Sequence, residues 1–546
     1  MKHIYFTLLL IWISTIATLH GADAQLFDGM GPHERVITTD SIEAQAYFNQ
    51  GLTWMYSFNH DEAIRSFNRA AELDPSSAMA WWGVSLAAGP QYNHPKLTEE
   101  RSSTAWNAMQ EAIKRIDNTT DLERSLIKAL RHRNAKTEPD EDGRKQLNQA
   151  YADAMAKIWK AHPNDSDIGS LYAESLMIRR PWKLYSVKDQ APHEDTPYIL
   201  SVLERVLAID PDHPGALHLY IHAIEPSKQP YKGLFAADRL SNLVPGSGHM
   251  LHMPSHIYVK AGQWEKAYLQ NERAMKADTL YRRLSPEQKA QHIYMTHNAH
   301  VAVYAALMGG REEEAMAAAR NMWDNVDEKI LAESPRVERW MSSVYDVHKR
   351  FGRWDDLLAE PAPPEYMLVT NATWRAARAV AFAAKKDFEN AEKEYDLFRK
   401  ARERIPRDYL WSSDTVDTVL EVSNLFIAGE LALQKEQWSR AAELLVRAIR
   451  IEDGLAFREP PQWVQPTRHT LGVVYLKAGK FREAESVYRK DLEKWPNNGW
   501  SLFGLSQALA EQGRADEASA AMKQHLVSWK DADAPIATSC KCVPQI

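Results

Sequence analysis

An all-α solenoid of stacked antiparallel helix pairs is the fold that the sequence predicts. Two copies of a thirty-four-residue helix-turn-helix pattern lie near opposite ends of the 546-residue chain, with small residues where two helices would touch. The first copy comprises Gly51, Trp54, Ala63, Phe67, Ala70 and Pro75. The second comprises Gly472, Tyr475, Gly479, Ala484, Tyr488 and Pro496. Because a solenoid grows by stacking rather than around one core, we expect one extended domain over residues 25–546.

The N-terminus predicts a signal peptide over residues 1–24. Lys2 precedes an apolar run from Ile4 to Leu19, and Ala22-Asp23-Ala24 has the A-x-A form of a cleavage site. An uncleaved anchor is the alternative, but the run is short for a membrane span. We therefore expect an exported protein, periplasmic or secreted, with no transmembrane segment after cleavage.

Along the mature chain, we expect the clearest repeats at residues 44–77, 248–281, 465–498 and 499–532. Weaker copies are centred on Gly310 and Ala315, Ala379 and Ala391, and Gly429, Ala441 and Ala448. These signatures resemble the tetratricopeptide repeat (TPR), and the resemblance covers most of the mature chain. It implies a TPR-type α-solenoid with degenerate middle repeats, and it is almost silent on chemistry. Residues 97–161 are helical by apolar periodicity, although no repeat signature fits them.

Three Pro-rich segments interrupt the helical pattern, at residues 179–197, 359–366 and 453–466. Long irregular connections in a compact array are often functional. The third segment leads directly into the helix that carries His469, and we expect it to lie over the groove of the solenoid.

Composition and motifs exclude several classes of function. The net charge of −7 provides no basic field for a nucleic-acid backbone, so nucleic acid is not an expected partner. There is no Gly-rich phosphate loop, G-x-S-x-G elbow, H-E-x-x-H motif or C-x-x-C-H haem attachment. Only Cys540 and Cys542 are present, and this pair is a tail disulfide, a soft-metal ligand pair or part of a tail without a role.

Histidines cluster at equivalent positions of three consecutive repeats. They are His218, His222, His249, His252, His256, His297 and His300. The TPR resemblance implies that positions two, five, nine and twelve of each first helix line the concave groove. In that register Glu225 falls at position twelve of one repeat and Tyr304 at position nine of another. Residues spaced by three and four lie on one face of a helix, so each set forms one stripe.

Such stripes predict a metal site in the groove. Helix axes lie roughly 8–10 Å apart, so imidazoles on neighbouring helices can reach a shared ion at about 2.0–2.1 Å. The proposed ligands are His218, His222, Glu225, His249, His252, His256, His297 and His300. They exceed the needs of one tetrahedral ion, so one or two ions fit, and imidazole suits Zn, Cu, Fe or Ni.

Two functions from different classes follow. The first is an exported protein that binds one or two transition-metal ions, as a metal store or as a metal-dependent hydrolase or oxidoreductase. In the enzymatic version, Glu225 is a general base or ligand and Tyr304 a proton donor or ligand. The alternative is a non-enzymatic scaffold that docks a peptide, protein or small molecule in the groove, within a polymer-degradation or uptake system. A narrow, closed polar pocket around His252 favours the first function, and an open channel favours the second.

Overall fold

Helices make up the regular structure of the chain. The computed structural model describes residues 24–187, 189–288 and 291–541. Within these ranges there is no strand, and β-pairing is limited to isolated bridges between Tyr185 and Pro192 and between Leu410 and Thr415. The predicted all-α fold is therefore confirmed. The predicted signal peptide lies almost entirely outside the described residues, and no helix of the described part has the length and hydropathy needed to span a membrane.

The first half of the array carries fifteen helical elements up to the histidine-bearing segment. They are α1 (Ile42–Tyr56), α2 (His60–Leu73), α3 (Ala78–Ala88), α4 (Glu99–Lys114), η1 (Ile116–Asn118), α5 (Asp121–Leu130), α6 (Glu141–Ala161), α7 (Ser166–Met177), α8 (Thr196–Ile209), α9 (Pro214–Ile224), η2 (Pro230–Gly233), α10 (Leu234–Leu240), α11 (Gly248–His252), α12 (Pro254–Lys260) and α13 (Trp264–Leu284).

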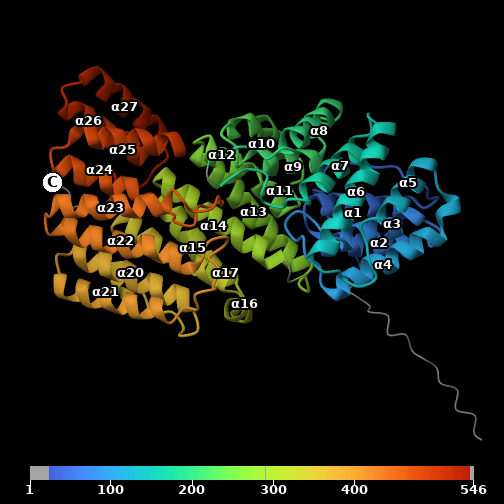
Figure 1. The fold of residues 1–546 in the computed structure, drawn as a ribbon, viewed down its shortest axis with the longest axis horizontal. Helices are drawn as coiled ribbons and strands as arrows, with labels where there is room; N and C mark the ends of the chain where they lie inside the picture. The colour runs from blue at the N-terminus through green and yellow to red at the C-terminus, as the bar shows by residue number, and fades with distance from the viewer. Residues whose placement is uncertain (1–23, 188, 289–290, 542–546) are drawn as a thin grey trace, which may run out of the picture.

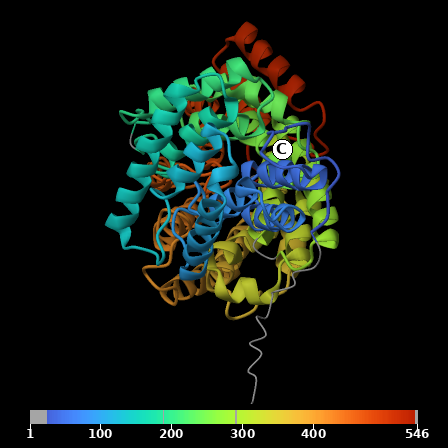
Figure 2. The same ribbon diagram turned by 90° about the vertical axis from the view of Figure 1, so that its right-hand side faces the viewer.

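The second half continues the stack to the C-terminus. Its helices are α14 (His292–Gly309), α15 (Glu312–Asn325), α16 (Glu328–Glu333), α17 (Pro335–Glu338), η4 (Arg339–Ser342), α18 (Ser343–Phe351), α19 (Trp354–Ala359), α20 (Leu368–Ala384), α21 (Phe388–Glu403), α22 (Val416–Gln434), α23 (Trp438–Glu452), α24 (Thr467–Lys477), α25 (Phe481–Lys494), α26 (Gly499–Glu511) and α27 (Ala515–Ser528). Figure 1 shows the array running from α1–α6 at one end to α20–α27 at the other, with α9–α14 between them. Figure 2 shows that the helices curve around the long axis.

One turn geometry recurs in eight helix pairs of the described chain. In each pair, the residue before the N-cap of the second helix has a positive φ. These residues are Phe58, Gly262, Gly310, Gly352, Lys386, Glu436, Gly479 and Gly513. The next amide donates to the carbonyl five residues earlier, as from Gln263 to Tyr258 at 2.8 Å, which closes the first helix in the manner of a Schellman motif. The stronger and weaker repeats of the sequence thus share one local structure.

Aromatic side chains on the second helices hold neighbouring repeats together. The ring of Phe67 on α2 packs so closely against Gly51 of α1 and Gly83 of α3 that a Cβ at either glycine would lie 2.7 or 2.5 Å from it. Tyr488 on α25 has the same relation to Gly472 of α24 and Gly504 of α26. Small residues beside one aromatic ring explain the repeat signature, because they let the helices approach closely.

The C-terminal repeats also pack back against the middle of the array. Trp264 Nε1 on α13 donates to the carbonyl of Pro496 at 3.2 Å, and Trp500 Nε1 on α26 donates to the carbonyl of Leu307 on α14 at 2.9 Å. The tail follows, because Ala534 donates its amide to the carbonyl of Gly310 at 3.2 Å. These contacts join α24–α27 to α12–α14, which carry three of the predicted histidines, His256, His297 and His300 (Figure 1).

The tail itself is packed and does not hold a soft-metal ligand at Cys540. This cysteine is buried and disulfide-bonded, while Cys542 lies outside the described residues. The neighbouring Ser539 hydroxyl donates to the carbonyl of His469 at 2.8 Å and lies 2.6 Å from the hydroxyl of Tyr488. The tail therefore contributes to the packing of the last repeats.

Two glycines at the same turn position allow a test of how much the packing of Pro496 contributes to the free energy of unfolding. Gly262 and Gly479 have φ of 68° and 70°, but a Cβ at Gly262 would lie 2.2 Å from the carbonyl oxygen of Pro496, whereas nothing lies within 4 Å of a Cβ at Gly479. Gly479→Ala should lower the free energy of unfolding by about 1–2 kcal/mol, the left-handed backbone penalty. Gly262→Ala should cost about 1–3 kcal/mol more from overpacking. Urea unfolding followed by circular dichroism measures both, and equal losses would contradict the packing of Pro496 on this turn.

Candidate metal centre

The predicted histidines come from four helices in the middle of the array. His218 and His222 lie one turn apart on α9, and Glu225 is the C-cap of that helix. His249 and His252 lie on α11, and His256 lies on α12. Pro254 separates these two helices, because proline lacks the amide hydrogen that would continue the hydrogen bonding of α11. His297, His300 and Tyr304 follow on α14. Six of the seven histidines come together in two adjacent groups of three.

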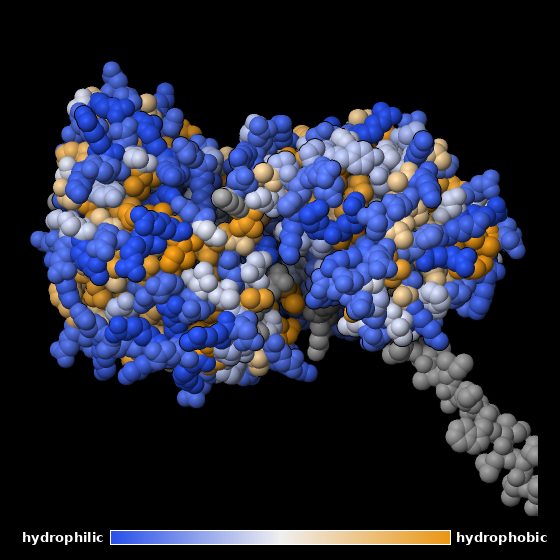
Figure 3. Space-filling view, viewed as in Figure 1, coloured by the Kyte–Doolittle hydropathy of each residue, from blue (hydrophilic) through white to orange (hydrophobic). Residues whose placement is uncertain are grey.

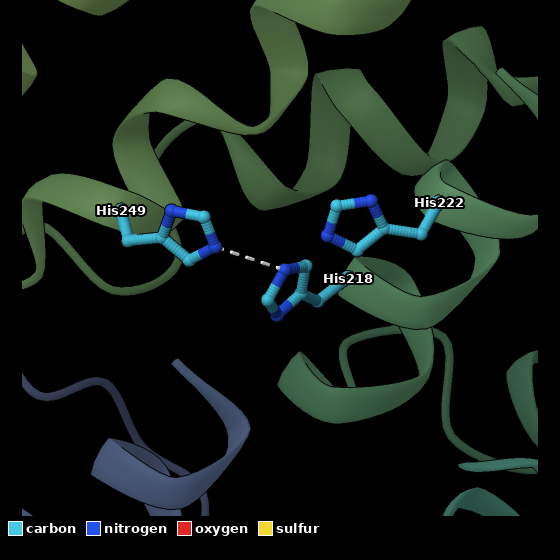
Figure 4. Close-up of side chains that lie close together, drawn as sticks. All are labelled: His218, His222 and His249. Atoms are coloured by element: carbon cyan, nitrogen blue, oxygen red, sulfur yellow. Dashed lines mark hydrogen bonds between the residues drawn. The ribbon is translucent and has the colours of Figure 1, made fainter. Parts of the chain in front are cut away.

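The first histidine cluster consists of His218, His222 and His249. One nitrogen from each ring lies within 4.8 Å of the others, and all three residues are buried. The Nε2 atoms of His249 and His218 are 3.2 Å apart (Figure 4). Figure 4 also shows the three rings directed toward one another from α9 and α11.

The second histidine cluster consists of His252, His256 and His297. Again one nitrogen from each ring lies within 4.8 Å of the others. The Nε2 atoms of His252 and His256 are 2.8 Å apart, and the ring of His297 packs edge-on against that of His252 at 4.8 Å between centroids.

Glu225 joins the two clusters. Its Oε1 accepts a hydrogen bond from Nδ1 of His222 at 3.1 Å, and its Oε2 accepts one from Nδ1 of His256 at 2.5 Å. Burial raises the pKa of this carboxyl, but the charge of His256 and the two hydrogen bonds lower it more, so its pKa lies well below the ordinary value. Both oxygens are thus committed to imidazoles, and the carboxylate orients one ring of each cluster.

Oxygen acceptors fix the tautomers of the other rings. Nδ1 of His218 donates to the carbonyl of Tyr56 at 2.6 Å. Nδ1 of His252 donates to Oδ1 of Asn271 at 2.6 Å, and the amide nitrogen of Asn271 is itself engaged by the carbonyl of Ala267. In four of the rings, Nδ1 therefore carries the hydrogen and Nε2 presents a lone pair. This is the arrangement in which outer oxygens prepare histidines to bind a metal through the other nitrogen.

The Nε2 atoms that face each other at the centre of each cluster lack oxygen partners. Two acceptor nitrogens cannot face each other at 2.8 Å, as Nε2 of His252 and His256 do, without a proton or a metal ion between them. In the first cluster His249 can donate to His218, but Nε2 of His222 remains buried without a hydrogen-bond partner. An orphaned buried imidazole nitrogen beside two others fits a metal ligand.

Burial sets the charge of these rings. It lowers the pKa of His218, His249 and His252 well below the ordinary histidine value, and the neighbouring imidazoles lower it further. Burial also lowers the pKa of His256, but the charge of Glu225 and its hydrogen bond more than offset this, so the pKa is raised. Of these four rings, His256 is therefore the one whose surroundings favour the protonated form.

Aromatic side chains enclose the first cluster. Phe58 lies 4.2 Å from the ring of His218 between centroids, and Trp182 lies 5.2 Å from that of His222. Both aromatic residues have positive φ, 57° and 60°, which is unusual for bulky side chains, and at Phe58 this φ belongs to the turn that Lys386 and Glu436 share. Phe58 occupies the turn position that is glycine in five other repeats, so its ring is directed onto the histidines at a cost in backbone strain.

Both clusters open onto one cavity of about 280 Å³. Its wall includes His222, His249, His256, His297 and His300, together with Trp340, Phe426 and residues 458–465. The Pro-rich segment 453–466 thus lies over the groove, as the sequence predicts. Glu459 of this segment forms an ion pair with Lys260 of α12 at 3.0 Å, which anchors the segment beside the second cluster.

His300 and Tyr304 lie apart from the two clusters. His300 lines the cavity, and its ring stacks on Trp340 at 5.4 Å between centroids. Burial and the charge of Arg339 lower its pKa to about 3. Tyr304 is fully buried between Trp264 and Trp495 and does not line the cavity. The TPR register predicts that Tyr304 faces the groove, but at this end of α14 the side chain packs against other repeats instead.

A third group of ligand-type side chains has a different character. His33, Asp167 and His213 also lie within 4.8 Å of one another, but Asp167 accepts hydrogen bonds from both rings, from Arg35 and from the hydroxyl of Tyr56. Nδ1 of His213 in turn accepts from the amide of Ala216 at 3.1 Å. Hydrogen bonds and the cation of Arg35 already satisfy this group, which makes it a structural ion-pair network.

Sequence reasoning missed the outer partners of the histidines. Asn271 and the carbonyl of Tyr56 carry no motif, because they reach the rings from helices that only the folded array brings near. The repeat register does place Glu225 beside the histidines. The sequence does not tell whether its oxygens contact a metal ion or the imidazoles of His222 and His256.

Comparison with known proteins supports the repeat assignment. Two family profiles described as tetratricopeptide repeat match residues 44–77 and 475–528. The human IFIT1 dimer with m7Gppp-AAAA is similar at 13% identity and a TM-score of 0.31, over 90% of this chain and 92% of that one. The APC/C hetero-tetramer Cut9-Hcn1 is similar at 13% identity and a TM-score of 0.29, over 90% and 74%. Scores of this size carry no conclusion about ligands, and no curated protein sequence matches the chain.

The network around Asp167 predicts a pH-dependent stability. Burial raises the pKa of Asp167, but hydrogen bonds from His213 and His33 and their charges lower it well below the ordinary value of 3.8. Its contribution is therefore complete above about pH 4 and is lost as the pH falls further. Asp167→Asn should lower the free energy of unfolding by about 3–5 kcal/mol at pH 7, because it removes the buried charge that Arg35 shares with Asp165 and that two histidine rings and Tyr56 contact. Urea unfolding at pH 7 and pH 3 tests this, and a loss that is equal at both pH values would contradict the ionised network.

Proposed function

The chain is a tetratricopeptide-repeat protein, and we propose that it binds one or two transition-metal ions through the two histidine clusters. Zn, Cu, Fe and Ni all suit imidazole ligands. The observation that carries the proposal is the inward convergence of Nε2 atoms whose rings are fixed by oxygens at Nδ1.

The spacing of the nitrogens agrees with shared coordination. Two ligands at about 2.0–2.1 Å from a tetrahedral ion lie roughly 3.3 Å apart. The Nε2 pairs of the first and second clusters are 3.2 and 2.8 Å apart, so each needs only a small ring movement. Each cluster supplies three histidines, which leaves a coordination position open for water or a substrate.

An open position is the basis for proposing catalysis. A bound ion there would supply either an activated water for hydrolysis or a redox centre for an oxidase. Glu225 is engaged by two imidazoles, so we assign it to positioning these rings rather than to proton transfer. The chain is proposed to work outside the cytoplasm, in the periplasm or as a secreted protein, on the basis of the signal peptide expected at residues 1–24.

The docking alternative requires an open groove. In the described structure the segment 453–466 and the C-terminal repeats pack across the histidine-bearing helices, and the remaining space is a cavity of about 280 Å³. A cavity of this size suits a small molecule better than an extended peptide. The side of the molecule that faces the viewer in Figure 3 is mostly hydrophilic, with apolar residues between the hydrophilic ones.

Elemental analysis of the mature chain tests the proposal. The chain from Gln25 onward, produced without a histidine tag and dialysed after metal loading, should retain one or two equivalents of a single transition metal. His252→Ala should lose the metal of the second cluster, because it removes one of three ligands. His33→Ala is the matched control and should retain all metal. A wild-type chain that stays metal-free after loading would favour the docking scaffold, and full occupancy in His252→Ala would remove that residue from the ligand set.

Glu225 provides a second prediction. Glu225→Gln keeps the size of the side chain but removes its negative charge and replaces one acceptor oxygen with an NH₂ group. Only one of the two rings can then donate to it. Metal affinity should fall about 10–100-fold, as for other outer partners of metal-binding histidines, while the number of sites stays the same. Competition with a chromogenic chelator measures this affinity. Unchanged affinity would show that the carboxylate does not prepare the two rings.

A further inference from the structure

The wall of the cavity beyond the histidines is aromatic, and several of its residues have buried polar atoms without a hydrogen-bond partner, among them the neighbours Gln462 and Trp463. Phe426 and Trp463 pack with centroids 5.5 Å apart and a 60° tilt, and both line the same cavity as His256 and His297. Trp340 extends this surface to the second cluster, because its ring lies 5.8 Å from that of His297. Aromatic walls of this kind hold a flat apolar ligand by stacking or edge contacts.

One unused polar atom is the side-chain oxygen of Gln462. The amide nitrogen of Gln462 donates to Asp414 and to the carbonyl of Ala456, so two acceptors fix the orientation of the amide. Its Oε1 is left without a partner, although the residue is buried and lines the cavity. Buried acceptors without a partner are costly, and they fit a ligand that donates a hydrogen bond.

A second such atom is the indole nitrogen of Trp463, the next residue. Nε1 of Trp463 is buried and has no partner, and this residue also lines the cavity. An indole nitrogen only donates, so it fits a ligand atom that accepts. A hydroxyl group is both a donor and an acceptor, so its chemistry matches both the acceptor of Gln462 and the donor of Trp463.

Charged groups of both signs line the cavity: the cations Arg339, Lys349 and Arg458 and the carboxylates Asp346 and Glu459. Arg339 lies over the ring of Trp340 at 5.2 Å. Lys349 lies over the rings of Trp463 and Phe426, but its ammonium already pairs with Asp346 at 2.9 Å. Arg458 donates to the hydroxyl of Ser412 at 2.6 Å, and the carboxylate of Glu459 lines the same cavity.

We propose that the cavity binds a small aromatic alcohol of the phenol class, with its ring on Phe426 and Trp463 and its hydroxyl between Gln462 and Trp463. The volume of about 280 Å³ limits the ligand to a small molecule. The inference rests on the proposed metal centre, since it names the substrate class that the two histidine clusters would receive.

A ligand series tests this assignment on the mature chain. Calorimetric titration at pH 7 should show saturable binding of phenol. Anisole, which cannot donate to Gln462, should bind about fivefold more weakly, the value of one hydrogen bond. Toluene should bind more weakly than anisole, since it can neither donate nor accept. Benzoate should bind no better than phenol. Equal binding of phenol and toluene, tighter binding of benzoate, or no saturable binding of phenol would overturn the proposal.

A matched pair of variants tests the indole nitrogen. Trp463→Phe keeps an aromatic ring and removes the donor, so phenol should bind about fivefold more weakly. Trp374→Phe is the control, because Nε1 of Trp374 is also buried without a partner but this residue does not line the cavity. Loss of phenol binding in both variants, or in neither, would contradict the assignment.

Metal content measured on the same samples separates the two proposals. A metal-loaded chain that does not distinguish phenol from toluene overturns only the aromatic-alcohol inference. A metal-free chain that distinguishes them, and loses this in Trp463→Phe, supports the hydroxyl subsite while contradicting the metal centre.

Discussion

The orientation of the imidazole rings is the constraint on which the site depends. Glu225, Asn271 and the carbonyl of Tyr56 take the Nδ1 hydrogens of four histidines, and this turns the Nε2 lone pairs toward two shared points. Without those oxygens the same histidines would be hydrogen-bonded core residues, as His213 is in the network of Asp167. The two histidine clusters therefore differ from the Asp167 network in their outer partners, which is the basis for proposing them as metal ligands.

The repeat architecture supplies that constraint in a rigid form. Each outer partner comes from a different element: Tyr56 ends α1, Glu225 caps α9 and Asn271 lies on α13. These elements meet at the site because α1 packs on α9, and α13 packs on α11 and α12. In addition, Trp264 and Trp500 tie the C-terminal repeats to the middle of the array. The same closure turns an open groove into a cavity, and the segment anchored by Lys260 and Glu459 completes it. The packing between repeats thus forms both the array and the cavity beside the histidines.

Much of the fold could be predicted from local sequence. Glycine indicates four of the turns, at Gly262, Gly310, Gly479 and Gly513, and all four have positive φ. The same backbone conformation occurs at Phe58, Lys386 and Glu436, where no glycine indicates it. The six clustered histidines could be placed on one surface from their spacing together with the groove positions that the TPR resemblance implies. Tyr304 could not, because the direction of its side chain depends on Trp264 and Trp495, which pack around it from other repeats. Asn271 and the interaction of Glu225 with two rings depend on the folded array in the same way.

Anomalous X-ray diffraction from crystals of the metal-loaded chain tests the central claim most directly. Data collected at the absorption edge of the bound metal locate it without reference to the protein coordinates. The account predicts one or two peaks, each at about 2.0–2.1 Å from Nε2 atoms of the first or second histidine cluster. A peak bound elsewhere, or loaded crystals with hydrogen-bonded histidines and no peak in either cluster, would contradict it.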